Sequence, residues 1–369
     1  MSVIGKTTIH FDDEQAMLLD YARSYCRDTG GSEAARQFLE AEDDYSAEQW
    51  EAMVAMGWTG IGLPEAVGGS LGIGAAVPVI ESMGRNLMGT PLMSSLLTAQ
   101  MLLRAGGARH EEILAAFASG AKGAVATIES GDWFGPISAR IEGGRLFGEK
   151  QLVADAASAD FLMVSALRDG EPVLALVAAS ALEADAVRPR TMIDLTHRAA
   201  DIHFAGTGVV EVFAGDDAAA ALRDYRLLGA LLVAAESTGA AASCLDTVVE
   251  YLKTRKQFGK LIGSYQALKH PAVDILNGVD SSRSFVYHAA SLVSAQALDK
   301  DAEVACRMAK AQATDTLKYA GDRAVQFHGG MGFTWDCDAQ LYARRAQWAQ
   351  QQFGDAQHHR RRLAALLLD

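Results

Sequence analysis

The chain has 369 residues, of which 50% are hydrophobic and 21% are charged, a composition typical of globular proteins with sizeable cores. Its formal net charge of −13 argues against general nucleic-acid binding, because attraction to phosphates requires a basic surface. The longest apolar run, Leu227–Ala235, is about half as long as a bilayer-spanning helix requires, and residues 1–11 show no signal-peptide core. The four cysteines form no paired motif. We therefore expect a reduced, cytoplasmic protein.

Residues 1–118 are predicted to form an N-terminal α-helical domain. Ser46 is followed three residues later by Gln49, a capping-box pattern that predicts the start of a helix. A glycine-rich loop then leads into a long apolar-periodic stretch at about residues 75–103. Near the start of the domain, the spacing predicts a helix whose buried face carries Met17, Leu18, Tyr21 and Tyr25.

Residues 119–216 are predicted to form a middle antiparallel β domain. Short apolar runs such as GAVATI, DFLMVSAL and EPVLALVAA alternate with turn residues. Gly143-Gly144 and Asp169-Gly170 are typical of tight β-hairpin turns. The regular turn spacing over this region favours several antiparallel strands.

Residues 217–369 are predicted to form a C-terminal α-helical bundle. The region is rich in alanine and contains few helix-breaking residues. Leu245, Val248, Val249 and Leu252 follow the i, i+3, i+4, i+7 spacing of one helical face.

The segment Thr254–His270, TRKQFGKLIGSYQALKH, combines basic, aromatic and glycine residues beyond what a purely structural helix needs. On a helix, Arg255 and Phe258 would share one face. Arginine can donate a bidentate pair to a phosphate, and an aromatic ring can stack on a flat ring. The alternative is structural: a helix that ends at Gly259, solvated charges, and a new helix near Tyr265.

The segment Val325–Asp336, VQFHGGMGFTWD, places Gly329-Gly330 within a helical pattern. Each glycine inside a helix costs about 1 kcal/mol relative to alanine. The pair therefore indicates either a helix end or a backbone that closely approaches a ligand.

Together, the motifs RKQFG..I...Q..KH and QFHGG.GFTW resemble signatures of the acyl-CoA dehydrogenase family, in the right order and separation. The likeness covers nearly the whole chain and includes the loop LPEAVGGS. It implies an α+β fold with an N-terminal α-helical domain, a middle antiparallel β domain and a C-terminal four-helix bundle. It also implies FAD at a subunit interface.

The resemblance further implies which residues hold the cofactor. Arg255 would contact the FAD pyrophosphate and Phe258 the adenine side. Gln326 and the backbone of Gly329 and Gly330 would contact the adenosine diphosphate portion. In the family, these groups reach a flavin that the neighbouring subunit mainly holds.

The family's reaction is α,β-desaturation of an acyl-CoA thioester, in which a Glu removes the α-proton. Its usual position falls here on Phe353, and the alternative position on the first bundle helix falls on Gly229. Neither side chain accepts a proton, so we expect no catalytic residue in this chain.

The segments that face the flavin ring also depart from the family pattern. The TEP..GSD-like segment reads TIESGDWFG, Thr127–Gly135, and the K.WIT-like strand reads KQLVA. Leu152 thereby replaces an aromatic residue, and Ala154 replaces a hydroxyl. We therefore expect that the middle domain does not hold a competent flavin ring.

These departures suggest the base-lacking subunit of a heteromeric (α2β2) acyl-CoA dehydrogenase, as known among actinobacterial enzymes that act on steroid side-chain CoA esters. A second acyl-CoA dehydrogenase subunit, in a heterotetramer, would carry the catalytic Glu and the flavin-ring site. A steroid side-chain CoA ester is the substrate by analogy. Electron-transfer flavoprotein is the electron acceptor that the resemblance implies, and neither nucleic acid nor a membrane is expected.

Two alternatives stay open from the sequence. A homo-oligomeric enzyme could use another base, such as Glu236, which lies two helical turns beyond Gly229, although a structural role for Glu236 is favoured. Asp355 and Asp336 are weaker candidates. The other alternative is a flavin-free acyl-CoA-binding or assembly protein.

One further segment, HHRRR at His358–Arg362, is interpreted as a solvated helix face. Adjacent histidines on a helix point in different directions, so we expect no metal site there.

Overall fold

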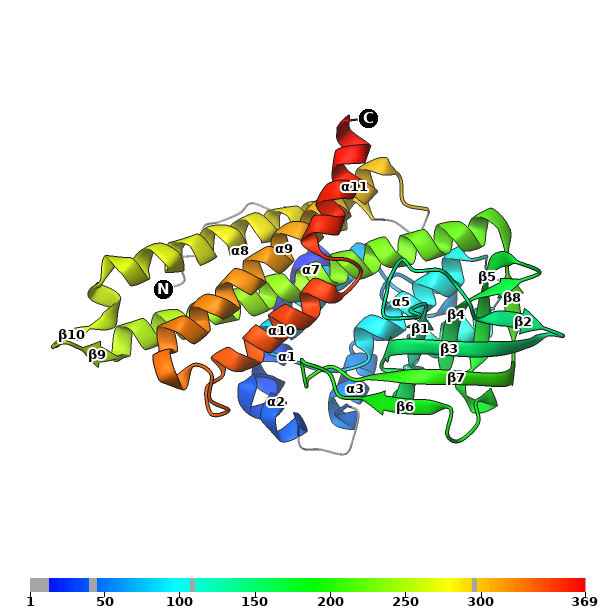
Figure 1. The fold of residues 1–369 in the computed structure, drawn as a ribbon, viewed down its shortest axis with the longest axis horizontal. Helices are drawn as coiled ribbons and strands as arrows, with labels where there is room; N and C mark the ends of the chain where they lie inside the picture. The colour runs from blue at the N-terminus through cyan, green and yellow to red at the C-terminus, as the bar shows by residue number, and fades with distance from the viewer. Residues whose placement is uncertain (1–12, 40–44, 107–109, 294–296, 369) are drawn as a thin grey trace.

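A computed structural model describes residues 13–39, 45–106, 110–293 and 297–368 (Figure 1). A β-sheet lies at one end of the molecule, and the C-terminal helices extend to the other end (Figure 1). One long helix, α7, runs along both parts.

The N-terminal helices form as predicted, but only half of the expected buried face of the first helix is correct, since Leu18 and Tyr25 pack against the core whereas Met17 and Tyr21 do not. Met17 and Tyr21 are 68% and 66% exposed. The buried face carries Leu19, Ala22 and Cys26, and the small side chains of the latter two let α1 pack closely against α4. The helices are α1 (Asp13–Thr29), α2 (Ser32–Leu39), α3 (Ala47–Ala55), α4 (Ala76–Arg85), α5 (Leu92–Arg104) and α6 (Glu111–Ala118).

The apolar-periodic stretch at residues 75–103 is divided into α4 and α5 by a loop. A Cβ atom on Gly89 would lie 2.0 Å from the carbonyl oxygen of Thr196. The loop backbone therefore lies directly against the middle domain, which only a glycine allows.

The middle domain is one mixed β-sheet in the order β6-β7-β3-β2-β4-β5-β8, with β1 beside β4. Most neighbouring strands are antiparallel, whereas β1 and β2 each pair in parallel with β4. Gly143-Gly144 and Asp169-Gly170 form the expected hairpin turns, with every residue at positive φ. The strands are β1 (Gly123–Ala126), β2 (Arg140–Glu142), β3 (Arg145–Ala154), β4 (Phe161–Arg168), β5 (Glu171–Ala178), β6 (Val187–Arg190), β7 (Ala199–Gly208) and β8 (Glu211–Phe213).

The C-terminal part is a helical bundle in which α7 contacts α8, α9 and α10. Helix α4 joins it closely, because a Cβ atom on Gly239 would lie 1.9 Å from the carbonyl oxygen of Glu81. The elements are α7 (Gly215–Thr254), β9 (Lys256–Gln257), β10 (Lys260–Leu261), α8 (Gln266–Leu292), α9 (Lys300–His328), α10 (Ala339–Gln351) and α11 (Ala356–Leu368).

Helix α7 has the length and apolar composition of a membrane-crossing helix, but 94% of its most apolar window is buried within the protein. It is therefore the central core helix of this fold.

The domain limits 1–118, 119–216 and 217–369 stay a prediction. Short 3-10 helices connect the main elements: η1 (Trp58–Gly60), η2 (Glu65–Val67), η3 (Ile73–Ala75), η5 (Ala156–Ser158), η6 (Ala179–Ala181), η7 (Ile262–Ser264) and η8 (Gly329–Met331).

Candidate functional site

Arg255 and Phe258 lie on a hairpin rather than on a helical face, so that part of the sequence interpretation was wrong. Helix α7 ends at Thr254, and β9 and β10 follow at once. Phe258 and Gly259 form the two-residue turn, with φ of 53° and 75°. This conformation suits a type I′ hairpin turn, which costs little for Gly259 but strains Phe258. The turn holds the Phe258 side chain 89% exposed.

Gly329 and Gly330 lie immediately beyond the end of α9, as a helix-end pattern predicts. Gly329 caps the helix with φ 61° and ψ −139°, a conformation that disfavours a side chain. A Cβ atom on either glycine would meet no other atom within 4 Å. Open space in front of this backbone leaves room for a ligand.

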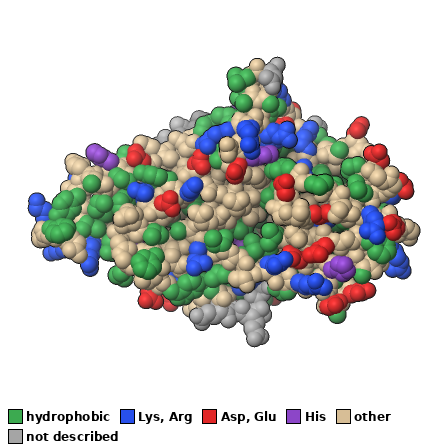
Figure 2. Space-filling model, viewed as in Figure 1, with side chains coloured by type: hydrophobic (Ala, Val, Ile, Leu, Met, Phe, Trp, Pro, Cys, Tyr) green, Lys and Arg blue, Asp and Glu red, His purple; other side chains and the backbone are tan. Residues whose placement is uncertain are grey.

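The two segments meet through the ends of α7 and α9. The Tyr251 ring of α7 stacks on the His328 ring of α9, with centroids 4.3 Å apart. The candidate residues are exposed at this end of the molecule, where apolar and basic side chains gather (Figure 2). We call this the tail surface: Arg255, Phe258, Gln326, Gly329 and Gly330, flanked by the exposed side chains of Met331, Phe333 and Trp335.

A second neighbourhood lies deep in the molecule, where both predicted base positions come together. Phe353, in the turn between α10 and α11, packs its ring directly on Gly229 of α7. A Cβ atom on Gly229 would lie 2.2 Å from two carbons of that ring. Trp133 packs on Phe353 with centroids 4.3 Å apart and planes tilted by 33°, and Tyr225 meets Phe353 edge-on at 5.4 Å. This aromatic cluster contains both positions at which the sequence led us to look for a base.

Lys310 holds the turn that carries Phe353 through hydrogen bonds to its backbone. The buried Lys310 Nζ donates hydrogen bonds to the carbonyl oxygens of Ala349 (3.0 Å) and Gly354 (2.9 Å). Burial lowers the pKa of Lys310 to about 7. These bonds fix Phe353 in its left-handed conformation, with φ of 54°.

His359 corrects the prediction of a fully solvated helix face at His358–Arg362. It is buried next to Lys310, and burial together with nearby positive charges lowers its pKa to about 2. The described residues include no group of three or more His, Cys, Asp or Glu side chains that could hold a metal ion.

Leu152 and Ala154, where the family pattern has an aromatic and a hydroxyl, both line two cavities between the sheet and the bundle. The inner cavity, of about 60 Å³, extends toward α4 and α5 and includes Met83 and Leu97. The outer cavity, of about 270 Å³, lies beside Asp132 and opens toward α10. The inner cavity has room for only a few water molecules.

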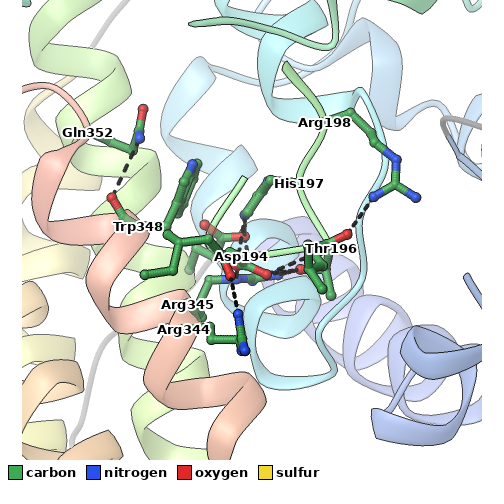
Figure 3. A network of polar contacts seen from close by, with 11 residues as sticks. Asp194, Thr196, His197, Arg198, Arg344, Arg345, Trp348 and Gln352 are labelled. Carbon is green, nitrogen blue, oxygen red and sulfur yellow. Dashed lines mark hydrogen bonds and ion pairs between the residues drawn. The ribbon is translucent and has the colours of Figure 1, made fainter. Parts of the chain in front are cut away.

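Glu236, the alternative base, belongs to a buried ion network around Arg345. Arg345 Nη1 donates to Glu236 Oε1 at 2.7 Å. Arg345 also donates to Asp194 and Thr196 (Figure 3). His197 Nε2 lies 3.2 Å from Glu236 Oε1. Burial alone would raise the pKa of Glu236, but the positive charge of Arg345 and the nearby His197 lower it. A carboxylate stabilised in this way is a weak base, which favours the structural role.

One oxygen of Glu236, Oε2, has no hydrogen-bond partner among the described residues. Glu236 lines the inner cavity, which can hold the water that would satisfy this atom. The weaker candidates lie elsewhere: Asp355 caps α11 by accepting a hydrogen bond from His358 N (2.6 Å), and Asp336 is exposed beyond η8.

Sequence reasoning missed three residues of the inner neighbourhood: Trp133, Lys310 and Arg345. For Lys310 and Arg345 the available signal was a charge at a position that helical periodicity places inside the bundle. For Trp133 it was the mismatch of Thr127–Gly135 with the family pattern, which showed that something had changed without showing what replaced it.

Comparison with protein families gives two matches that together span most of the chain. Residues 12–121 match the N-terminal domain of acyl-CoA dehydrogenases, and residues 221–368 match their C-terminal domain.

Individual relatives agree with these matches. The acyl-CoA dehydrogenase IpdE2 of Mycolicibacterium smegmatis is 31% identical over 355 residues, which cover 96% of this chain and 98% of that protein. The solved structure of a variant of the Tcur3481-Tcur3483 steroid ACAD superimposes with a TM-score of 0.83 at 26% identity, covering 96% of this chain and 98% of that one. The ChsE4-ChsE5 complex from Mycobacterium tuberculosis has the same fold, with a TM-score of 0.84 at 24% identity and 98% of each chain covered.

Proposed function

Because this chain belongs to the acyl-CoA dehydrogenase family, we propose that it is the base-lacking subunit of a heteromeric enzyme of that family. The chain is an oxidoreductase component with FAD as its cofactor. A partner subunit carries the catalytic Glu and the flavin-ring site, and this chain supplies cofactor contacts in trans.

The observation that carries the proposal is the contact between Phe353 and Gly229. The family takes its base from one of these two positions. Here the side chain at one position packs on the backbone of the other, and Trp133 closes the cluster. A substrate α-proton at this place would face hydrocarbon instead of a carboxylate.

The tail surface fits the nucleotide portion of FAD. Arg255 presents an exposed guanidinium for a phosphate, Phe258 an exposed ring for adenine, and Gly329-Gly330 an open backbone. The ring portion is not matched in the same way, because Leu152 and Ala154 offer neither an aromatic face nor a hydroxyl. When bound, FAD supplies the hydride acceptor for α,β-desaturation, and the partner subunit would hold that reactive ring.

The exposure of the tail surface supports its position at an interface. Met331, Phe333 and Trp335 follow one another at every second position and are 56%, 75% and 44% exposed, and exposed apolar surface can mark a protein interaction site. A partner subunit that covers them would bring its flavin next to Arg255. The two-component relatives, Tcur3481-Tcur3483 and ChsE4-ChsE5, support a heterotetramer by analogy.

We extend the proposal to the substrate and the electron acceptor. The steroid ACAD among the structural neighbours supports a steroid side-chain CoA ester as the acyl-CoA substrate. Electron-transfer flavoprotein is the acceptor that the family implies, and the cytoplasm is the expected compartment.

The test compares the chain alone with the chain co-expressed with the dehydrogenase subunit encoded beside it. Flavin absorbance and acyl-CoA oxidation are measured on both preparations. We expect the lone chain to lack turnover and to be deficient in flavin, and the complex to contain FAD and to turn over. Full flavin loading and turnover by the lone chain would refute the heteromer.

A matched pair of arginine variants tests the cofactor contact in the complex. Arg255→Ala should lower flavin content by about tenfold or more at limiting FAD, since a charge-assisted phosphate contact contributes about 1.5–3 kcal/mol. Arg168→Ala changes an equally exposed arginine at a β-hairpin and should leave flavin content unchanged. A colourless complex, unaffected by either change, would favour the flavin-free assembly protein.

A further inference from the structure

Three cavities meet around the aromatic cluster, and the same few side chains form the walls between them. In addition to the inner and outer cavities, a basic cavity of about 250 Å³ is lined by Arg223, Arg226, Arg307 and Arg362. Phe134 borders the basic and outer cavities, and Trp133 borders the inner and outer ones. Phe134 and Trp133 thus each separate the outer cavity from one of the other two, and Phe353 lines both the basic and the inner cavity.

The wall is built from one short segment that reaches across from the sheet to the bundle. Trp133 packs on Phe353, and the Phe134 ring stacks on the His358 ring with centroids 4.1 Å apart and planes 9° apart. The Arg226 guanidinium lies 5.2 Å from the centre of the Phe134 ring. The segment therefore contacts α7, the turn before α11, and α11 itself.

The segment is anchored at its base as well as at its tip. Buried Glu129 accepts hydrogen bonds from the backbone N–H groups of Ser138 (2.7 Å) and Ala139 (3.1 Å), which ties the two ends of the loop together. At the tip, Arg226 Nη2 donates to the carbonyl oxygen of Trp133 at 3.1 Å. Gly131, at φ 75°, permits the turn into the tip. A loop held at both points is a defined structural part of the fold.

We propose that Trp133 and Phe134 form an internal plug that closes this subunit's own acyl channel. The basic cavity is the charged mouth of that channel, and the inner cavity is its apolar end. Each cavity alone is smaller than the roughly 300 Å³ at which small-molecule sites begin. With the plug in place, a long acyl group cannot pass from the mouth to the apolar end.

The plug determines ligand selectivity in this subunit. A CoA thioester gains affinity over free CoA only by burying its acyl chain, and the plug denies that burial. The inference uses the proposed function solely to choose an acyl-CoA as the ligand. Its test needs neither flavin nor turnover, so a failure of the heteromer proposal would not affect the result.

The experiment measures the dissociation constants of octanoyl-CoA and of free CoA by calorimetry, using the full-length chain. For the unaltered protein we expect octanoyl-CoA and free CoA to bind with the same affinity. For the double variant Trp133→Ala/Phe134→Ala we expect octanoyl-CoA to bind at least tenfold more tightly than CoA, on the order of what burial of a few methylene groups supplies. Tyr21→Ala, which removes an exposed aromatic ring on α1, is the control and should behave as the unaltered chain.

Two further variants keep the test decisive if the double variant is unstable. Phe134→Ala alone should show a smaller gain in the same direction, while Trp133→Phe should keep the channel closed. Thermal unfolding of each variant establishes that it is folded. A tenfold preference for octanoyl-CoA in the unaltered chain, or no preference in a folded Phe134→Ala or double variant, would overturn the plug.

Discussion

Gly229→Ala offers a direct test of the packing of Phe353 on Gly229. In an ordinary helix interior this change stabilises by about 1 kcal/mol, because alanine has the higher helix propensity. Here the new Cβ atom would lie 2.2 Å from two ring carbons of Phe353, far inside the 3.5–4.0 Å optimum for carbon–carbon contact. Overpacking of this kind costs about 1–3 kcal/mol, so the net effect should be destabilisation by up to about 2 kcal/mol.

The sign of the effect should reverse when the ring is removed. Phe353→Ala alone should cost about 3–5 kcal/mol through the cavity that it creates. In that background Gly229→Ala meets no ring, and helix propensity should then make it stabilising by about 1 kcal/mol. The two changes should therefore couple by about 1–3 kcal/mol in a double-mutant cycle.

The assay is urea unfolding of the four proteins in the same assembly state. Gly239→Ala is the matched control, because its Cβ atom would strike the carbonyl oxygen of Glu81 at 1.9 Å and not Phe353. Gly239→Ala should lower the free energy of unfolding by the same amount in the unaltered chain and in Phe353→Ala. If Gly229→Ala stabilises the unaltered chain, or has the same effect with and without the Phe353 ring, the packing argument is incorrect.

Three other outcomes are expected. Arg345→Leu should destabilise by about 3–5 kcal/mol in unfolding assays, since it leaves two buried carboxylates, Asp194 and Glu236, without their cation. Glu236→Gln should leave turnover of the heteromer unchanged, and loss of turnover in a folded complex would instead identify Glu236 as a base. Lys310 has a folded-state pKa lowered to about 7, so the unfolded chain binds more protons above that pH. Unfolding free energy should therefore rise between about pH 7 and pH 10 and rise less steeply in Lys310→Met.

Local signals in the sequence predicted the elements whose geometry depends on near neighbours. Ser46 accepts a hydrogen bond from Gln49 N, as the capping pattern indicates, and the Gly143-Gly144 turn joins two strands. The predicted face of α1 was only half correct because Ala22 and Cys26 are small, and a periodicity count favours large residues such as Tyr21. Which face is buried depends on how closely α4 approaches, and that is a tertiary property.

The candidate site likewise combines features that local sequence could predict with features that depend on tertiary packing. The cofactor role of Arg255 and Phe258 stays a prediction, and the helical spacing gave the wrong geometry for them, because the strained turn at Phe258 closes a hairpin instead. The expected absence of a base stays a prediction, and it depends on the identities of both Phe353 and Gly229. Their mutual contact could not be predicted, because it joins positions more than a hundred residues apart.

The packing around Phe353 and Gly229 supports the prediction that neither position carries a base. If only one position had lost its carboxylate, the site would keep a polar gap that water could fill. Instead the ring of Phe353 requires glycine at 229, Trp133 covers the ring, and two hydrogen bonds from Lys310 hold its strained turn. A carboxylate restored at either position would enter a packed aromatic cluster, where burial disfavours its charged form. Under the proposed function the base would therefore come from another chain, and the exposed tail surface would meet that chain's cofactor.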